Sequence, residues 1–139
     1  MVPIDNRIGI GLLGMGVIGS RVAQFVTEQE DYFAHTLGVR LALHSILVQD
    51  ITKRRNDSLS NNLLSTNPDN ILNDPKISVV LELMGGEQPA LSYIERALYQ
   101  QKHVVTANKE VIAKHGPRLQ AIARHQQVQL RYEASVGGG

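Results

Sequence analysis

A glycine-rich turn near the start of the chain has the composition and spacing that bind phosphate. It consists of Gly14, Met15, Gly16, Val17, Ile18 and Gly19, which fit the pattern G-x-G-x-x-G. In this pattern the first glycine permits a tight turn, the second lets the backbone approach a pyrophosphate, and the third lets helix and strand pack closely. The N–H groups at the start of the next helix offer donors and partial positive charge to phosphate oxygens. We therefore predict that these residues bind a dinucleotide, the alternative being a purely structural glycine turn.

Charged residues after the second apolar run bear on which dinucleotide binds. Asp50 lies 31 residues after Gly19, where about 20 is usual, because the intervening helix is long. An acid at this place hydrogen-bonds the ribose 2′-OH of NAD, whereas a base binds the 2′-phosphate of NADP. Asp50 thus favours NAD, and the cluster Lys53, Arg54 and Arg55 favours NADP, so both cofactors stay open. The alternative for the basic cluster is a solvated charged loop.

Two further groups of residues stand where later apolar runs end. Gly85-Gly86 follows one run, and Thr106-Ala107-Asn108-Lys109 ends the next. Open α/β sheets bind ligands at the carboxyl ends of their strands, so we predict that Gly85, Thr106 and Lys109 contact the cofactor. A lysine there can neutralise phosphate, hold a carboxylate or polarise a carbonyl. The alternative for Lys109 is an exposed side chain in the first turn of a helix.

The remaining ionisable residues follow no pattern that indicates chemistry. Glu82 interrupts an apolar run, and we expect it to pair with a neighbouring donor. The histidines, which are His35, His44, His103, His115 and His125, do not have the spacing of metal ligands. The chain has no cysteine, which excludes disulfides and thiolate zinc sites and is compatible with a reducing compartment.

Short apolar runs alternate with amphipathic stretches, which is typical of an α/β fold with a mostly parallel sheet. The predicted strands are Arg7–Leu13, Leu41–Val48, Ile77–Met84, His103–Thr106 and Val128–Glu133, with a short edge strand at Leu63–Thr66. The predicted helices are Val17–Leu37, ended by Gly38; Pro68–Leu72, capped by Asn67; Pro89–Gln101; and two pieces, Lys109–His115 and Pro117–Gln126, broken at Gly116-Pro117. This order predicts a Rossmann-type, doubly wound sheet with the first strand central.

Composition narrows the class of protein further. The 139 residues are enough for one domain, and 42% of them are apolar, which suffices for a core. The net charge of +1 provides no basic surface for nucleic acid or for a membrane. No apolar stretch is long enough to span a bilayer, and Met1–Asn6 does not resemble a signal peptide, so we expect a cytoplasmic protein.

Four segments together carry a family resemblance that covers essentially the whole chain. They are LLGMGVIGSRV, LELMGGEQPALSYIERAL, KHVVTANKEVIAKHG and LRYEASVGGG. In this order they resemble the nucleotide-binding part of homoserine dehydrogenase. Many dehydrogenases share the glycine turn, whereas HVVTANK and YEASVGGG are far more specific.

The resemblance implies an activity and roles for individual residues. The family interconverts L-homoserine and L-aspartate 4-semialdehyde with NAD or NADP, on the route to threonine, isoleucine and methionine. By this likeness Lys109 lies where cofactor and substrate meet and takes part in catalysis. Glu133 and the main-chain carbonyls of Val136 and Gly138 match the stretch that holds a monovalent cation, such as Na⁺, in some members.

The resemblance also implies that part of the enzyme is absent from this sequence. Residues 1–139 correspond to the cofactor-binding domain, and the substrate and dimerisation domain is not present. The sequence stops inside a motif that normally continues, so we expect a truncated or excised domain that binds cofactor without turnover. The parent enzyme is expected to be a homo-oligomer.

Two alternatives to this function remain open at this point. One is another Rossmann oxidoreductase, acting on sugars or semialdehydes, which would share the glycine turn but not TANK and YEAS at these places. The other is a non-catalytic dinucleotide-binding redox sensor, which would need a surface for a partner or for DNA.

Overall fold

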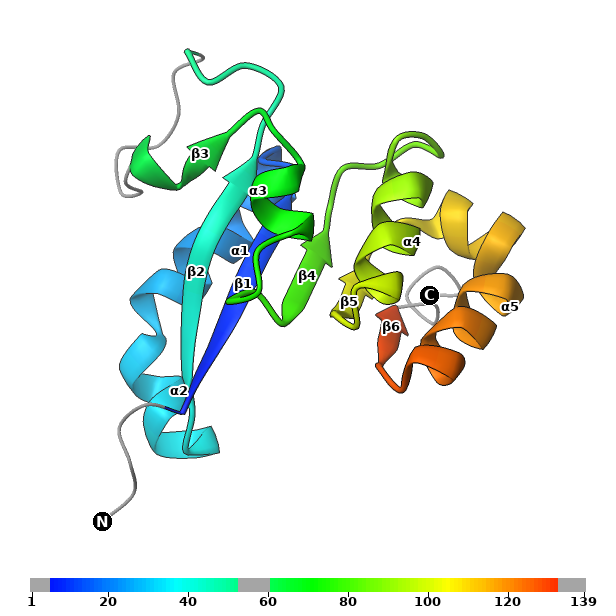
Figure 1. Ribbon diagram of the computed structural model, residues 1–139. Helices are drawn as coiled ribbons and strands as arrows, with labels where there is room; N and C mark the ends of the chain where they lie inside the picture. The colour runs from blue at the N-terminus through cyan, green and yellow to red at the C-terminus, as the bar shows by residue number, and fades with distance from the viewer. Residues whose placement is uncertain (1–5, 53–60, 133–139) are drawn as a thin grey trace, which may run out of the picture.

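Six strands form one sheet in the computed structural model, which describes residues 6–52 and 61–132 of the chain. Within those residues the strands are β1 (Arg7–Leu13), β2 (Arg40–Leu47), β3 (Leu64–Ser65), β4 (Val79–Glu82), β5 (His103–Thr106) and β6 (Leu130–Tyr132). The α-helices are α1 (Val17–Glu28), α2 (Glu30–Leu37), α3 (Asp69–Leu72), α4 (Ala90–Tyr99) and α5 (Lys109–Gln126), with a 3₁₀ turn at Asn61–Leu63 (Figure 1).

The strand order is β3-β2-β1-β4-β5-β6, and neighbouring strands pair in parallel. This is the order of the doubly wound Rossmann sheet, in which the chain runs outward in both directions from a central first strand. The predicted fold class and the central place of the first strand are confirmed. The order reverses between β1 and β4, so their carboxyl ends border the crevice where such sheets bind ligands.

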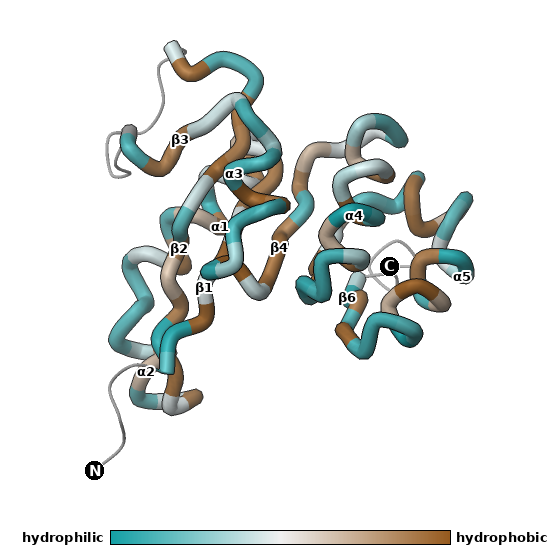
Figure 2. The backbone as a smooth tube through the Cα atoms, in the orientation of Figure 1, coloured by the Kyte–Doolittle hydropathy of each residue, from teal (hydrophilic) through white to brown (hydrophobic). Residues whose placement is uncertain are grey.

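The tube in Figure 2 is brown, and so apolar, along β4 in the middle of the sheet. Alternate residues of the central strands pack on opposite faces of the sheet. Leu12 of β1 and Ile46 of β2 share a core cluster with Ala23 of α1. Leu13 and Leu47, the next residues along the same strands, belong to the larger cluster, which α3, α4 and α5 complete. Side chains alternate between faces with a period of two, so consecutive apolar residues supply both cores. The helices that complete these two cores cover the faces of the sheet and leave the carboxyl ends of its strands uncovered.

The predicted helix over residues 17–37 is two helices, and the prediction of one helix was wrong. The chain leaves helical geometry at Gln29, with φ −101° and ψ 20°, and α2 begins at the next residue. Phe25 and Phe33 then meet edge to face with their ring centroids 5.6 Å apart. No glycine or proline marks this break, and the apolar period continues through it. Gly38 ends α2 in the left-handed conformation, with φ 73°, as predicted.

The predicted break at Gly116-Pro117 is absent, because α5 runs unbroken from Lys109 to Gln126. A proline inside a helix costs roughly 3 kcal/mol through a lost hydrogen bond and a clash with the preceding turn. Pro117 and Ala113, whose carbonyl loses its partner, are both exposed, so water can reach that carbonyl. Buried residues on the other side of α5, Leu119 among them, pack against the core and keep the helix continuous.

Other boundaries differ from the predicted ones by one or two residues. β4 spans Val79–Glu82 rather than Ile77–Met84, and the edge strand is only Leu64–Ser65. Pro68 and Pro89 precede α3 and α4 instead of lying inside them. β6 is seen over Leu130–Tyr132, and Glu133, its predicted last residue, lies outside the described residues.

At the amino-terminal edge of the sheet, opposite the crevice, a buried lysine joins the segment before β5 to the segment between α3 and β4. Lys102 Nζ donates to the carbonyl oxygens of Asp74 and Ile77, both at 2.6 Å. Burial lowers the pKa of the Lys102 ammonium, although the nearby charge of Asp74 acts in the other direction. In the described part of the chain, no helix has the length and apolar character needed to cross a membrane.

Candidate functional site

A cavity of about 620 Å³ opens at the carboxyl edge of the sheet, where β1, β2 and β4 end. Its lining comes from the glycine turn, the ends of β2 and β3, the loop after β4 and the start of α4. These residues are Gly14, Met15, Gly16, Leu47, Val48, Gln49, Asp50, Thr66, Leu83, Met84, Gly85, Gln88, Pro89 and Tyr93. The topology of the sheet therefore brings together segments that are up to 79 residues apart in the chain.

The glycine turn has a different steric reason for each of its three glycines. Gly14 has φ 103° and donates its N–H to the carbonyl of Leu47 at 3.1 Å, which ties the turn to β2. A Cβ added at Gly19 would lie 2.5 Å from the carbonyl oxygen of Gly14, so a side chain there would push the helix off the turn. A Cβ at Gly16 would meet no atom within 4 Å. The space in front of Gly16 is open, and the turn and packing roles predicted for Gly14 and Gly19 fit this geometry.

The first turn of α1 presents its backbone N–H groups without a side-chain cap. Gly16 is the N-cap residue, makes no side-chain hydrogen bond to the helix, and is followed by no acidic residue in the first turn. Val17 and Ile18 are 76% and 62% exposed, so their side chains point away from the core. The N-terminus of α1 is therefore available to an anion, to which its N–H groups and helix dipole are complementary.

Asp50 lies on the β2 side of the cavity, as predicted. Its Oδ1 accepts hydrogen bonds from the backbone N–H of Thr52 at 2.9 Å and from the Thr52 hydroxyl at 2.6 Å. This local turn fixes the direction of the carboxylate at the end of β2. Lys53, Arg54 and Arg55, the predicted readers of a 2′-phosphate, lie outside the described residues.

The loop after β4 forms the opposite wall of the cavity. Gly85 and Gly86 have φ of 80° and 75°, a left-handed conformation that L side chains adopt only with strain. Of this pair Gly85 lines the cavity, as do its chain neighbour Met84 and, from α4, Tyr93. Gly85 was predicted from its place after an apolar run, and Met84 was predicted only as the end of a strand. Tyr93 was not predicted, because it reaches the cavity only through the packing of α4.

Glu82, the last residue of β4, is completely buried beneath this wall. Its Oε1 accepts from the Thr106 hydroxyl. Its Oε2 accepts from the backbone N–H of Met84 at 2.9 Å and, at longer range, from Gly85 N–H at 3.4 Å and Asn108 Nδ2 at 3.5 Å. The expectation that Glu82 pairs with neighbouring donors is confirmed, and the donors come from two separate loops.

Thr106 and Lys109 stand at the same edge, one strand further along. Thr106 is buried and lines a second, smaller cavity of about 340 Å³, together with Ala107. Asn108 caps α5, since its Oδ1 accepts from Val111 N–H at 3.1 Å, and its Nδ2 donates to the Gly86 carbonyl at 2.6 Å. Lys109 is exposed in the first turn of α5. The capping role of Asn108, which lies within TANK, was not predicted from the sequence.

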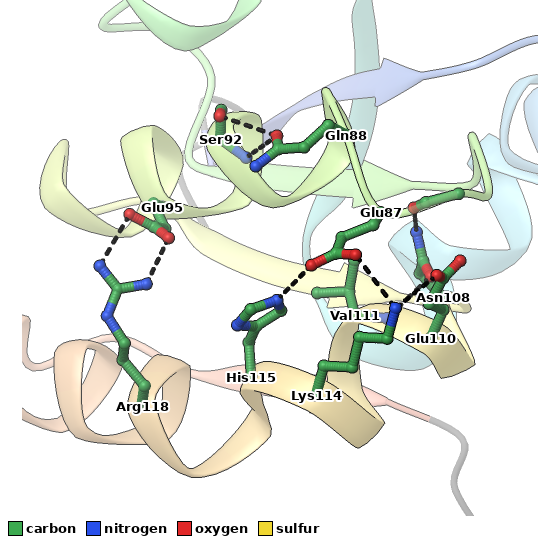
Figure 3. A network of polar contacts seen from close by, with 11 residues as sticks. Glu87, Gln88, Ser92, Glu95, Asn108, Glu110, Val111, Lys114, His115 and Arg118 are labelled. Carbon is green, nitrogen blue, oxygen red and sulfur yellow. Dashed lines mark hydrogen bonds and ion pairs between the residues drawn. The ribbon is translucent and has the colours of Figure 1, made fainter.

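A network of charged residues on the surface joins the start of α4 to α5 (Figure 3). Glu87 accepts from His115 Nε2 at 2.7 Å and from Lys114 Nζ at 3.1 Å, and Lys114 also bonds Glu110 at 2.9 Å. The hydrogen bonds from His115 and Lys114 lower the pKa of the Glu87 carboxyl. Further along the two helices, Arg118 of α5 pairs with Glu95 of α4. The network holds α5 against the segment that leads from the cavity into α4.

The described residues include no group of three or more histidine, aspartate or glutamate side chains that could hold a metal ion. The predicted cation ligands Glu133, Val136 and Gly138 lie outside those residues.

A parallel sheet of this order, with a glycine turn and an uncapped helix at its switch point, defines a Rossmann-type dinucleotide-binding domain. Residues 14–133 match the family model described as the NAD binding domain of homoserine dehydrogenase. The chain belongs to this family, as the resemblance in the sequence implied.

Individual relatives agree with the family match. The chain is 37% identical to a homoserine dehydrogenase of Bacillus subtilis over 96% of its own length, and 39% identical to one of Synechocystis over 95%. Among solved structures, a homoserine dehydrogenase of Staphylococcus aureus superposes with a TM-score of 0.88 at 36% identity over 94% of this chain. One from Thiobacillus denitrificans superposes with a TM-score of 0.84 at 33% identity over 93% of it.

The match covers only part of each relative. The chain spans 31% of the Bacillus protein, 30% of the Synechocystis protein and 33% of the Staphylococcus chain. The similarity therefore concerns the cofactor-binding part of these enzymes.

Proposed function

We propose that the larger cavity binds NAD or NADP as the cofactor of a homoserine dehydrogenase. The observation that carries this proposal is the place of the glycine turn, at the point where the strand order reverses, with open space in front of Gly16. Ligands of open α/β sheets bind at such a point because loops on its two sides diverge and leave a crevice. An anionic diphosphate fits the donor set there, which is the uncapped first turn of α1.

Each half of the dinucleotide is assigned a side of the cavity. The diphosphate lies over Gly14–Gly19, and Asp50 is placed to hydrogen-bond the adenosine ribose. The nicotinamide half extends towards the loop after β4 and the end of β5, where Gly85 and Thr106 stand. When bound, the nicotinamide supplies the hydride chemistry, and the protein supplies binding and orientation.

The choice between NAD and NADP depends on opposing charges after β2. Asp50 repels a 2′-phosphate, and the positive charges of Lys53, Arg54 and Arg55 offset that repulsion. We expect the triple alanine variant to lose affinity for NADPH and to keep its affinity for NADH, as measured by calorimetric titration. Equal losses for both cofactors would show that the cluster does not read the 2′-phosphate.

The activity proposed for the whole enzyme is the interconversion of L-homoserine and L-aspartate 4-semialdehyde. Hydride transfer requires the alcohol carbon to be held against the nicotinamide, and such positioning is worth about 7–11 kcal/mol of barrier. Lys109 is proposed to act at that junction, but one lysine supplies no substrate pocket. We assign the pocket, and the contacts between subunits of a homo-oligomer, to further chain of the kind that the longer relatives have.

Two finer assignments rest on the resemblance and on composition alone. Glu133, with the carbonyls of Val136 and Gly138, is proposed to hold a monovalent cation such as Na⁺. Exchanging Na⁺ for the larger Cs⁺ should then change the activity of the whole enzyme. In a Glu133→Gln variant the activities in Na⁺ and in Cs⁺ should be equal. A cytoplasmic location is proposed from the absence of cysteine in the sequence.

An absorbance assay of NAD(P)H formation with homoserine tests the proposed activity. We expect this chain to bind cofactor without turnover, and a version extended through the adjoining domain to turn over. In the extended version Lys109→Ala should abolish turnover while cofactor still binds. Turnover by the short chain at the rate of the extended enzyme would refute the assignment of the substrate pocket to further chain.

A further inference from the structure

Glu82 is a buried acid with an unusual number of donors around one carboxylate. Four groups donate to it: a hydroxyl, two backbone N–H groups and a carboxamide. Burying a charged group without partners is costly, and hydrogen bonds to an ionised acceptor are about twice as strong as neutral ones. These hydrogen bonds therefore fix the Glu82 side chain and, equally, the groups that donate to it.

The partners of Glu82 belong to the two segments that border the proposed nicotinamide side. Met84 and Gly85, in the loop after β4, line the larger cavity. Thr106 ends β5 and lines the smaller cavity, and Asn108 starts α5 directly before Lys109. Asn108 also donates to the Gly86 carbonyl at 2.6 Å, so the two segments are joined directly as well as through Glu82.

The loop after β4 needs such support because of its own conformation. Gly85 and Gly86 both have positive φ, and an added Cβ at either position would meet no atom within 4 Å. Glycine also has the largest conformational freedom to lose on ordering. Beside the packing of Met84 against the core, the hydrogen bonds to Glu82 and from Asn108 therefore help to fix the path of this wall of the cavity.

We propose that Glu82 is a positioning residue for the nicotinamide half of the cofactor. It fixes the backbone at Met84–Gly85 and the start of α5 relative to each other, without touching the cofactor itself. This inference rests on the proposed function, because it assumes that NAD or NADP occupies the larger cavity. The adenosine half, on the β2 side at Asp50, should be independent of Glu82.

Glu82→Gln is the test, because the carboxamide keeps the size of the side chain but replaces one acceptor oxygen with a donor. We expect the affinity for NADPH or NADH to fall about tenfold, because the new N–H donor faces groups that are themselves donors and leaves one of them without an acceptor. The affinity for adenosine monophosphate, which probes the other half of the cavity, should change less than about twofold. Both affinities are measured by titration of the ¹⁵N-labelled chain and by calorimetry.

Lys102→Met is the matched control. Lys102 is also a buried charged residue that bonds to the backbone, but it lies at the opposite edge of the sheet. The variant should lower the thermal stability and leave both affinities unchanged. Asn108→Ser is a second test should Glu82→Gln fail to fold, because serine can still cap α5 but cannot reach Gly86 and Glu82 together. It should show the same selective loss of nicotinamide nucleotide.

The outcomes separate the inference from the proposed function. If the unaltered chain binds neither NADH nor NADPH, the proposed function is wrong. If it binds them and a folded Glu82→Gln or Asn108→Ser variant binds them equally well, the positioning role is wrong. A parallel loss of adenosine monophosphate and NADPH, or an equal loss in Lys102→Met, would show a general structural role and would also overturn the inference.

Discussion

Gly16 and Gly19 are three residues apart in one motif and have opposite steric surroundings. An added Cβ meets nothing at Gly16 but meets the backbone of Gly14 at Gly19. Gly16 has φ −77° and ψ −159°, which any residue adopts, so its own conformation does not require glycine. The fold therefore requires glycine at position 19 but not at position 16, where the proposed cofactor would occupy the open space.

Gly16→Val and Gly19→Val should consequently separate binding from stability. Valine at position 16 should lower the affinity for NADPH by at least about tenfold, because it fills the space of the pyrophosphate, and leave the melting temperature nearly unchanged. Valine at position 19 should lower stability by about 1–3 kcal/mol through overpacking against the turn. Calorimetric titration and thermal unfolding measure the two effects. Unchanged affinity in folded Gly16→Val would remove the phosphate role of the turn.

Glu87 contributes stability that depends on pH. Its pKa is lowered from the ordinary value of 4.5 by hydrogen bonds from His115 and Lys114. The unfolded state therefore binds a proton at Glu87 more readily than the folded state, so the contribution is complete above about pH 4.5 and is lost as pH falls through the lowered folded value. The free energy of unfolding of Glu87→Gln should approach that of the unaltered chain as the pH falls below about 4.5.

Urea unfolding of both proteins across the acid range measures this convergence. Glu28→Gln is the matched control, because Glu28 is exposed and accepts a hydrogen bond from the neutral side chain of Gln24 at 3.0 Å. A stability difference between Glu87→Gln and the unaltered chain that stays constant down to low pH would contradict the role of the pair with His115.

At two places in the helices, the local sequence signal and the observed structure disagree. Gly116-Pro117 reads locally as a helix end, yet α5 continues through it because its buried side is anchored by the core. The break at Gln29 has the opposite character, since no residue type announces it. Packing against residues distant in the sequence determines whether the helix continues or breaks at each place. Such contacts cannot be predicted from a single sequence.

Gly116→Ala tests the continuity of α5. An added Cβ would lie 3.5 Å from Ile112 Cγ2, an ordinary van der Waals contact, and Gly116 is in helical conformation. Alanine removes the conformational freedom of glycine, worth about 0.5–1 kcal/mol, but its Cβ meets the ring of Pro117, which disfavours helical geometry at the preceding residue. The two effects oppose each other, so the free energy of unfolding should change by less than about 1 kcal/mol. Gly38→Ala is the contrasting variant, because φ of 73° at the end of α2 should make alanine more strongly destabilising. A loss of stability in Gly116→Ala as large as that in Gly38→Ala would contradict a continuous helix at this position.

In the molecule as a whole, the parts of the site that follow strands were predictable. Gly14–Gly16, Asp50 and Gly85 come directly after apolar runs, and parallel strands bring such residues to one edge. Tyr93 and the hydrogen bonds from Thr106 and Asn108 to Glu82 were not, because they depend on how α4 docks and on pairs 24 or more residues apart. The roles of the predicted residues toward a cofactor stay predictions until a ligand is bound.

The most direct test is a titration of the ¹⁵N-labelled chain with NADPH and with NADH, followed by two-dimensional NMR. We expect saturable shifts in the amide signals of the glycine turn, of Asp50 and of Gly85, with one nucleotide bound per chain. Signals of α2 and of Lys102, which lie away from the cavity, should stay unchanged. Absence of saturable shifts with either nucleotide, or shifts confined to residues outside the carboxyl edge of the sheet, would contradict the proposed cofactor site.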